Sequence, residues 1–154
     1  MSKPSFVYVS YIATTPEKLW KALTSPEFTA QYWFGMRLAP ESDWRVGSRF
    51  TALRSDGTPG DAGEVLECDP PRRLSLTYRP GDERVRHEAP SRVTYELEPL
   101  GKEVRLTVTH DGFEEGSQLF EGVRVFWPQL LSSLKSFLET GTALDVTSAG
   151  APHH

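Results

Sequence analysis

Apolar side chains alternate with polar ones in several short stretches of the chain, which is the pattern of half-buried strands. The first stretch, residues 6–12, consists almost entirely of β-branched and aromatic residues. Further stretches follow in the middle of the chain, separated by turns rich in Gly, Pro and Asp. Because such strands follow one another with short turns, we expect an antiparallel meander. The candidate strands are 48–54, 62–69, 72–79, 91–98 and 103–110.

Two short helices are expected after the first strand. Thr15 can cap a helix that begins at Pro16, and Glu17 favours the positive end of its dipole. Ser25 and Pro26 end this helix and begin a second one by the same logic. An aromatic cluster follows the second helix directly.

The last regular element is predicted to be a long amphipathic helix. Gly141 stands where a left-handed cap would end it, and Pro128 indicates that the helix either begins close to that residue or kinks there. An antiparallel sheet with one apolar face needs a cover, and no other predicted element is long enough to supply it. The apolar residues recur at steps of three and four: Val123, Phe126, Trp127, Leu130, Leu131, Leu134, Phe137 and Leu138.

This order of elements predicts an α+β fold, in which a curved antiparallel sheet of about six strands wraps around the long C-terminal helix. Residues 1–141 are expected to form one domain, because the length suits a single hydrophobic core. Residues 142–154 are small and polar, and we expect them to form a disordered tail.

Composition narrows the class of protein. The chain carries a net charge of −4, which argues against nucleic-acid binding, since phosphate contacts need clustered positive charge. Cys68 is the only cysteine and no metal-ligand spacing occurs, so we expect no disulfide, no metal and no obligatory cofactor. No signal-peptide core and no membrane-spanning apolar run is present, which predicts a cytoplasmic protein.

The same elements resemble the activator of Hsp-90 ATPase homologue family, within the START-like (polyketide cyclase-like) superfamily. The resemblance extends from about Phe6 to Gly141. It implies the helix-grip fold, in which the long helix often stands off the sheet and leaves a cavity, and it makes a protein chaperone a candidate partner. The eukaryotic activators carry an additional N-terminal domain that contacts the chaperone, for which we expect no room in this chain. The matching segments are 13–24, 32–35, 45–50, 63–74, 106–113 and 127–141.

Strand alternation indicates which side chains face the long helix. Such residues either fill a solid core or line a ligand cavity of the usual size, ~300–1,000 Å³. The spacing alone favours a core, whereas the resemblance favours a cavity. The candidate ligand-binding residues are Trp33, Phe34, Phe50, Leu76, Tyr78, Tyr95, His110, Phe126, Trp127, Leu130 and Leu134.

His110 is the polar candidate on the covered face. It could bond a ligand, or act as an acid or base near neutral pH. We favour the alternative, a structural histidine at a strand end that is bonded to Asp111 or to a backbone carbonyl. His87 is expected in a solvated loop or hairpin tip, with gating of the pocket or binding of an acidic group as the alternative, and Arg92 is expected to be exposed. The three glycines of 57–63 are assigned to a turn.

Three functions are compatible with the sequence. The first, which we carry forward as the prediction, is binding of a small hydrophobic or aromatic molecule between sheet and helix. The second is a protein-interaction module related to chaperone activation. The third is a cyclase-type or hydrolase-type enzyme in which His110 or a tyrosine moves protons, although no nucleophile motif is present. The choice between monomer and homodimer stays open.

Overall fold

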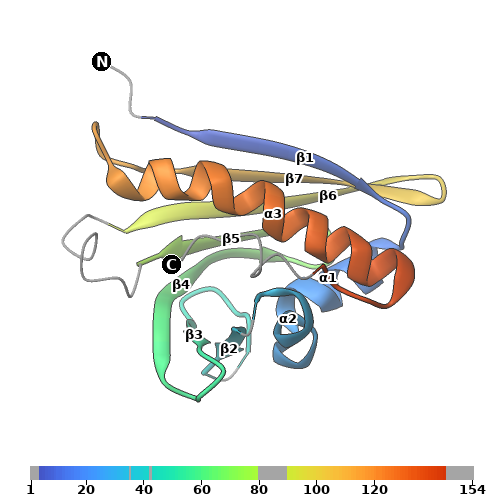
Figure 1. Cartoon of the computed structure of the whole chain (residues 1–154), viewed down its shortest axis with the longest axis horizontal. Coiled ribbons are helices and arrows are strands. Elements are labelled where there is room, and N and C mark those ends of the chain that lie inside the picture. Colours follow the sequence, from blue (N-terminus) through green and yellow to red (C-terminus); the bar gives the residue numbers. More distant parts are fainter. Residues whose placement is uncertain (1–3, 35, 42, 80–89, 145–154) are drawn as a thin grey trace.

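The computed structural model describes residues 4–34, 36–41, 43–79 and 90–144. His87 and residues 145–154 of the predicted tail lie outside these ranges. Figure 1 shows the elements in chain order. They are β1 (Phe6–Ile12), α1 (Pro16–Thr24), α2 (Pro26–Tyr32), β2 (Arg37–Pro40), β3 (Arg49–Leu53), β4 (Pro59–Asp69), β5 (Arg73–Tyr78), β6 (Ser91–Leu100), β7 (Glu103–Asp111) and α3 (Gln118–Thr140).

The described strands form one antiparallel sheet in the order β1-β7-β6-β5-β4-β3-β2. From β2 to β7 each strand pairs with the next along the chain, and β1 then adds to the far side of β7. The predicted α+β architecture is confirmed, with a seventh strand. The sequence analysis did not predict β2, because its four residues, which end in Pro40, are too few to show alternation.

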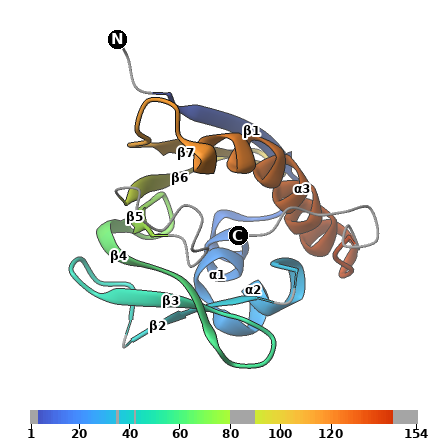
Figure 2. The same cartoon turned by 60° about the vertical axis from the view of Figure 1, so that its left-hand side comes forward.

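The long strand β4 gives the sheet its curvature. Its first half pairs with β3 and its second half with β5, and the register shifts between Val65 and Glu67. Such a bulge bends a strand and increases its twist. Figures 1 and 2 show β4 curving so that β2 and β3 lie beside α2. The glycines at 60 and 63, assigned to a turn from the sequence, belong to this strand.

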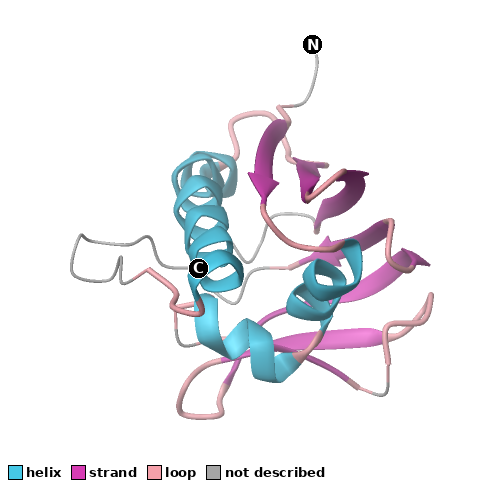
Figure 3. Cartoon of the chain, turned by 90° about the vertical axis from the view of Figure 1, so that its right-hand side faces the viewer, coloured by secondary structure: helices cyan, strands magenta, loops and turns pink. Residues whose placement is uncertain are grey.

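Helix α3 lies across the concave face of the sheet, and Figure 3 shows it beside the strands with α1 and α2 near its C-terminal end. It begins earlier than the sequence indicated, because the Ser117 hydroxyl caps it by accepting the Phe120 N–H at 3.1 Å. Pro128 lies inside the helix and neither starts nor ends it. The left-handed cap expected at Gly141 is present, with φ of 86°.

The two short helices form as predicted and close one end of the molecule. The Thr15 hydroxyl accepts the Lys18 N–H at 3.2 Å and caps α1. The Thr29 hydroxyl of α2 accepts the Leu38 N–H of β2 at 2.9 Å, so α2 is fixed to the curled part of the sheet. Phe137 packs this end of α3 onto α2, with its ring 6.2 Å from that of Tyr32.

Gly63 allows the close approach that the curvature requires. A Cβ atom there would lie 1.9 Å from the Thr77 carbonyl oxygen and 2.6 Å from the Phe50 ring. We therefore expect Gly63→Ala to lower the free energy of unfolding by about 3 kcal/mol, as overpacking a core does. Gly122→Ala is the matched control, because a Cβ at Gly122 meets nothing within 4 Å in the interior of α3. That control should raise stability by up to about 1 kcal/mol. Urea denaturation of both variants measures the difference, and equal effects would contradict the packing argument.

Candidate functional site

The residues singled out from the sequence gather on the side of the sheet that α3 covers. Leu76, Tyr78, Tyr95 and His110 lie on the inner faces of β5, β6 and β7, and all four are buried. Four more come from α3 and are also buried, and the rest lie on β3 and after α2. These others are Phe126, Trp127, Leu130, Leu134, Phe50, Trp33 and Phe34.

Aromatic rings touch one another from one end of this inner face to the other. Trp127 of α3 lies at the centre, with its ring 6.1 Å from that of Tyr95 and 6.2 Å from that of Trp33. Most of these contacts are edge-on or tilted, which suits the ring quadrupoles. The series of rings runs through Phe34, Phe126, Trp33, Trp127, His110, Tyr78, Phe50 and Trp44.

Phe34 differs from the other predicted site residues in its backbone. Its φ is +53°, in the left-handed region that a residue with a side chain rarely adopts. The strained backbone turns the half-buried ring towards Phe126, with 6.2 Å between the ring centroids. Strain of this kind persists where surrounding contacts over-determine it, and here it places an aromatic ring at the edge of the covered face.

His110 forms a chain of buried hydrogen bonds. The Trp127 indole Nε1–H donates to His110 Nδ1 at 3.0 Å, and His110 Nε2 lies 2.7 Å from the Ser91 hydroxyl. Because Nδ1 accepts, the proton of the neutral ring is on Nε2, which donates to Ser91 Oγ. Ser91 in turn donates to the Tyr78 carbonyl at 3.3 Å. The partners of His110 are thus Ser91 and Trp127, not Asp111 or a backbone carbonyl.

Burial keeps His110 neutral. It lowers the pKa of the imidazole to about 3, against a small opposing effect of the Asp111 carboxylate. Both ring nitrogens are engaged and the ring is 2% exposed. A general base near neutral pH needs a pKa near the working pH and a nitrogen that can reach the substrate. In this arrangement His110 instead fixes α3 to the sheet.

The Tyr78 hydroxyl is one of the buried polar groups that lack a hydrogen-bond partner of ordinary geometry. Tyr78 is 8% exposed, and its Oη makes no hydrogen bond of ordinary geometry. Burial raises the pKa of the phenol well above its usual value, and the nearby Asp61 carboxylate raises it further. Its ring is held between Phe50, at 5.9 Å, and His110, at 6.3 Å. The hydroxyl is therefore neutral and fixed in an aromatic setting.

Sequence reasoning missed three residues of this cluster. Ser91 lies within the expected strand 91–98 and shares the inward alternation of 93, 95 and 97, so the alternation itself was a signal that could have revealed it. Asp61 is 1% exposed and shares the inward parity of Gly63 and Val65, but we had placed it in a turn. Phe113 packs 4.4 Å from the His110 ring. Phe113 follows Gly112, whose φ of 82° turns the chain inward, and hydrophobic periodicity does not predict such a turn.

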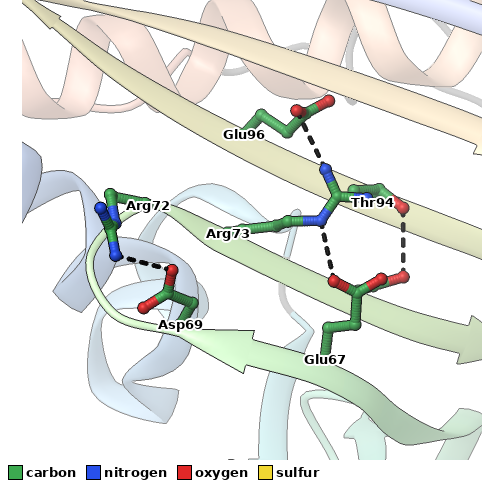
Figure 4. Close-up of polar contacts among 7 residues, drawn as sticks. Glu67, Asp69, Arg72, Arg73, Thr94 and Glu96 are labelled. Atoms are coloured by element: carbon green, nitrogen blue, oxygen red, sulfur yellow. Dashed lines mark hydrogen bonds and ion pairs between the residues drawn. The ribbon is translucent and has the colours of Figure 1, made fainter.

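The outer face of the sheet carries alternating charges. Arg73 bridges Glu67 and Glu96, each at 3.0 Å, as Figure 4 shows. These side chains are at least 41% exposed, so each pair contributes at most about 1 kcal/mol. Arg92, expected to be exposed, lies on this face and pairs with Asp111 at 2.9 Å. A groove of about 630 Å³ opens here, lined by Val9, Tyr11, Asp69, Arg72, Arg73, Glu96, Leu97, Glu98, Arg105 and Thr107.

Other chemistry has little support within the described ranges. No three His, Cys, Asp or Glu side chains gather there as a metal site would need. Burial and two nearby carboxylates raise the pKa of the Cys68 thiol, which disfavours the reactive thiolate. Among the described helices, none is both long and apolar enough to cross a membrane.

Comparison with known proteins decides the family. The sequence model described as "Activator of Hsp90 ATPase homolog 1-like protein" matches residues 13–139. The chain belongs to this family. No curated protein matches it.

Solved structures share the fold of this family member. The protein MLL2253 from Mesorhizobium loti is 27% identical, with a TM-score of 0.75 over 88% of this chain and 97% of that one. The Aha1 dimer from Colwellia psychrerythraea is 20% identical, with a TM-score of 0.72 over 90% and 98%. PFC0360w, an HSP90 activator from Plasmodium falciparum, is 22% identical, with a TM-score of 0.71 over 87% and 95%.

The buried His110 makes stability depend on pH. The native ring has a pKa of about 3, whereas an unfolded histidine titrates near ~6.5. Between these two pKa values the unfolded state binds a proton at His110 and the native state does not. The free energy of unfolding therefore falls as the pH drops from ~6.5 towards 3. We expect His110 to account for a loss of about 2 kcal/mol between pH 7 and pH 5. His110→Gln, which cannot titrate, should flatten this part of the profile in urea denaturation series. Parallel profiles for the two proteins would contradict a neutral native His110.

Two buried tyrosines provide a matched test of the unused hydroxyl. Tyr32 Oη donates to the Ala22 carbonyl at 2.7 Å, so Tyr32→Phe should cost about 1–2 kcal/mol. Tyr78→Phe removes a hydroxyl that has no such bond, and in ligand-free protein it should change stability by less than about 0.5 kcal/mol or raise it. Denaturation of protein refolded from urea gives both values. A cost for Tyr78→Phe equal to that for Tyr32→Phe would show that its hydroxyl is already satisfied.

Proposed function

We propose that the chain binds a small, largely apolar molecule between the concave face of the sheet and α3, and that the Tyr78 hydroxyl is its polar anchor. The observation that carries the proposal is the buried Tyr78 Oη, which makes no hydrogen bond of ordinary geometry. A buried hydroxyl without a partner costs free energy that a ligand group or an ordered water recovers. Ligand sites commonly combine apolar walls with a few polar groups of this kind.

A buried hydroxyl of α3 supports the same proposal. Ser133 of α3 is fully buried, and its Oγ also has no hydrogen-bond partner. In a helix interior such a hydroxyl ordinarily bonds the carbonyl four residues earlier or points to solvent. The sheet and the helix thus each present a buried hydroxyl among aromatic and aliphatic side chains, which suits a molecule with an apolar body and a hydrogen-bonding group at its edge.

Mass spectrometry tests this proposal directly. The freshly purified protein should show a mass excess under native spray conditions that disappears on denaturation, and fragmentation of the released molecule gives its class. A bound ligand stabilises the fold by RT ln(1 + [L]/Kd). At a hundred times Kd this is about 2.7 kcal/mol, so hydroxylated aromatic compounds added to refolded protein should include some that raise Tm by several degrees.

The tyrosine variants serve as controls for the anchor. Tyr78→Phe should weaken ligand binding about tenfold, which corresponds to a lost hydrogen bond of about 1.4 kcal/mol. Tyr32→Phe should leave the affinity unchanged, because its hydroxyl is already bonded to Ala22. The proposal fails if no bound mass is found and no compound raises Tm. Equal affinities in Tyr78→Phe and wild type would remove Tyr78 as the anchor.

A protein-interaction role is the second candidate function. The family name and the Plasmodium HSP90 activator among the similar structures favour it. An identity of 22% supports a shared fold only. Binding to a chaperone is therefore a proposal and does not follow from the structural similarity. A rise in a chaperone's ATPase rate on addition of this chain would support it. The enzyme alternative loses its leading residue, since His110 is engaged at both nitrogens.

A further inference from the structure

The two edges of the sheet are treated differently by the sequence. β2 forms one edge with four residues, begins with Arg37 and ends with Pro40. Short length, charge and proline are the ordinary ways to prevent an edge strand from pairing with another chain. β1 forms the other edge with seven residues, Phe6–Ile12, and contains no charged residue, proline or glycine. By the same rule, β1 lacks the features that prevent an edge strand from pairing with a strand of another chain.

The outward side chains of β1 are apolar. Val7 is 56% exposed, Val9 42% and Tyr11 48%. On this face their neighbours in β7 are polar, with Thr107 opposite Val9. The three side chains therefore form an exposed apolar stripe along an open edge, in a protein whose other sheet surface is charged.

The backbone groups of the same three residues point away from the sheet. The Leu97 N–H of β6 donates to the Arg72 carbonyl, so the odd-numbered residues of β6 bond towards β5. Antiparallel strands alternate the direction of these bonds residue by residue. Through the unbroken register of β6, β7 and β1, the even-numbered residues of β1 then bond to β7. The N–H and C=O groups of Val7, Val9 and Tyr11 face outward.

Helix α3 confirms this direction and closes one end of the edge. Lys135 Nζ donates to the Tyr11 carbonyl at 2.5 Å, and the Glu139 carboxylate accepts the Ala13 N–H at 2.8 Å. Both bonds engage odd-numbered residues on the side away from β7. The last turns of α3 therefore block pairing beyond Tyr11 and leave the edge open from Val7 to Tyr11.

We propose that two copies of the chain pair antiparallel through β1, about a two-fold axis at Val9. In this register Val9 faces the second copy's Val9, and Val7 faces its Tyr11. Only outward-pointing backbone groups then oppose one another, so Val9 exchanges both hydrogen bonds with its copy. Val7–Tyr11 is a β-branched–aromatic pair, which stabilises adjacent strands. The interface is self-complementary, as a two-fold dimer requires.

The neighbouring registers are poorer. A two-fold axis at Tyr11 would require the Ala13 N–H, which Glu139 already holds. An axis at Val7 would place Val9 opposite Ser5, outside the strand. Lys135 on the Tyr11 carbonyl does not prevent the Val9 register, because a carbonyl oxygen accepts through two lone pairs. A two-fold axis at Val9 is therefore the register that pairs the open edge along its full length, from Val7 to Tyr11.

The oligomeric state as a function of concentration tests the proposal. In sedimentation equilibrium the average mass should rise from 17.3 kDa towards twice that value as the concentration increases. Val9→Lys places two like charges opposite each other at the axis and should weaken the dimer at least about tenfold. Val46→Lys is the matched control, since Val46 is 68% exposed and lies far from β1 in the chain. It should dimerise as wild type does. A wild type that stays monomeric at millimolar concentration, or a Val9→Lys that dimerises unchanged, overturns the proposal.

Cross-linking tests the register separately. Paired Cα atoms at the axis would lie about 5.5 Å apart, within the range that a disulfide spans. In a Cys68→Ser background, Val9→Cys should therefore form a disulfide-linked dimer under air oxidation. Val7→Cys should not, because Val7 faces Tyr11 across the axis. Efficient cross-linking of Val7→Cys with none at Val9→Cys would overturn the two-fold pairing at Val9. It would point to another register or another partner on this edge.

Discussion

The hydrogen bond from the Trp127 indole to His110 determines how the long helix sits on the sheet. It is the first of a series that passes from α3 through His110 of β7 and Ser91 of β6 to the backbone of Tyr78 in β5. The strand register makes the series possible, because Val93 pairs with His110 and Tyr78 pairs with Ser91. Each group is buried, so losing one partner would leave a polar atom unsatisfied in an apolar interior.

This series also sets the chemistry of the covered face. It uses the backbone carbonyl of Tyr78 and leaves the hydroxyl of the same residue to the interior. The His110 ring, which packs against Tyr78, has no nitrogen left to share. His110 therefore acts as a structural histidine, the interpretation that the sequence analysis favoured although its hydrogen-bond partners are different, and a tyrosine at a strand end becomes the available polar group. Ligand recognition here would depend on a hydroxyl set among aromatic rings beside the Asp61 carboxylate, and no cluster of metal-binding side chains occurs within the described ranges.

Periodicity was sufficient for most of the fold and for the composition of its inner face. The alternation along β5, β6 and β7 correctly separates inward from outward side chains, and Gly141 correctly marks the end of α3. What periodicity could not show depends on contacts distant in sequence. The bonding of His110 to Trp127 requires the docked helix. The burial of Asp61 requires β4 to begin at Pro59, where glycine and proline suggest a turn. The start of α3 before Pro128 requires the Ser117 cap, a local signal that the proline obscured.

The two surfaces of the sheet differ in a way that follows from the same constraint. Because α3 covers the concave face, the apolar residues of β5 to β7 on that face are buried. The outer face is open to water and carries exposed ion pairs, except along β1, where the side chains are apolar. The three regions therefore have separate roles. The interior is buried, the outer face of the central strands is exposed to water, and the β1 edge is the region proposed to pair with a second copy.

In the proposed function, the Tyr78 hydroxyl is kept for a bound molecule. A high-resolution crystal structure of the protein as purified tests it most directly, through the electron density around Tyr78 Oη. We expect density for a small molecule, or for an ordered water that a ligand displaces, within hydrogen-bonding distance of that oxygen and beneath α3. A Tyr78 hydroxyl bonded to Asp61, with closely packed side chains on every other side, would contradict it.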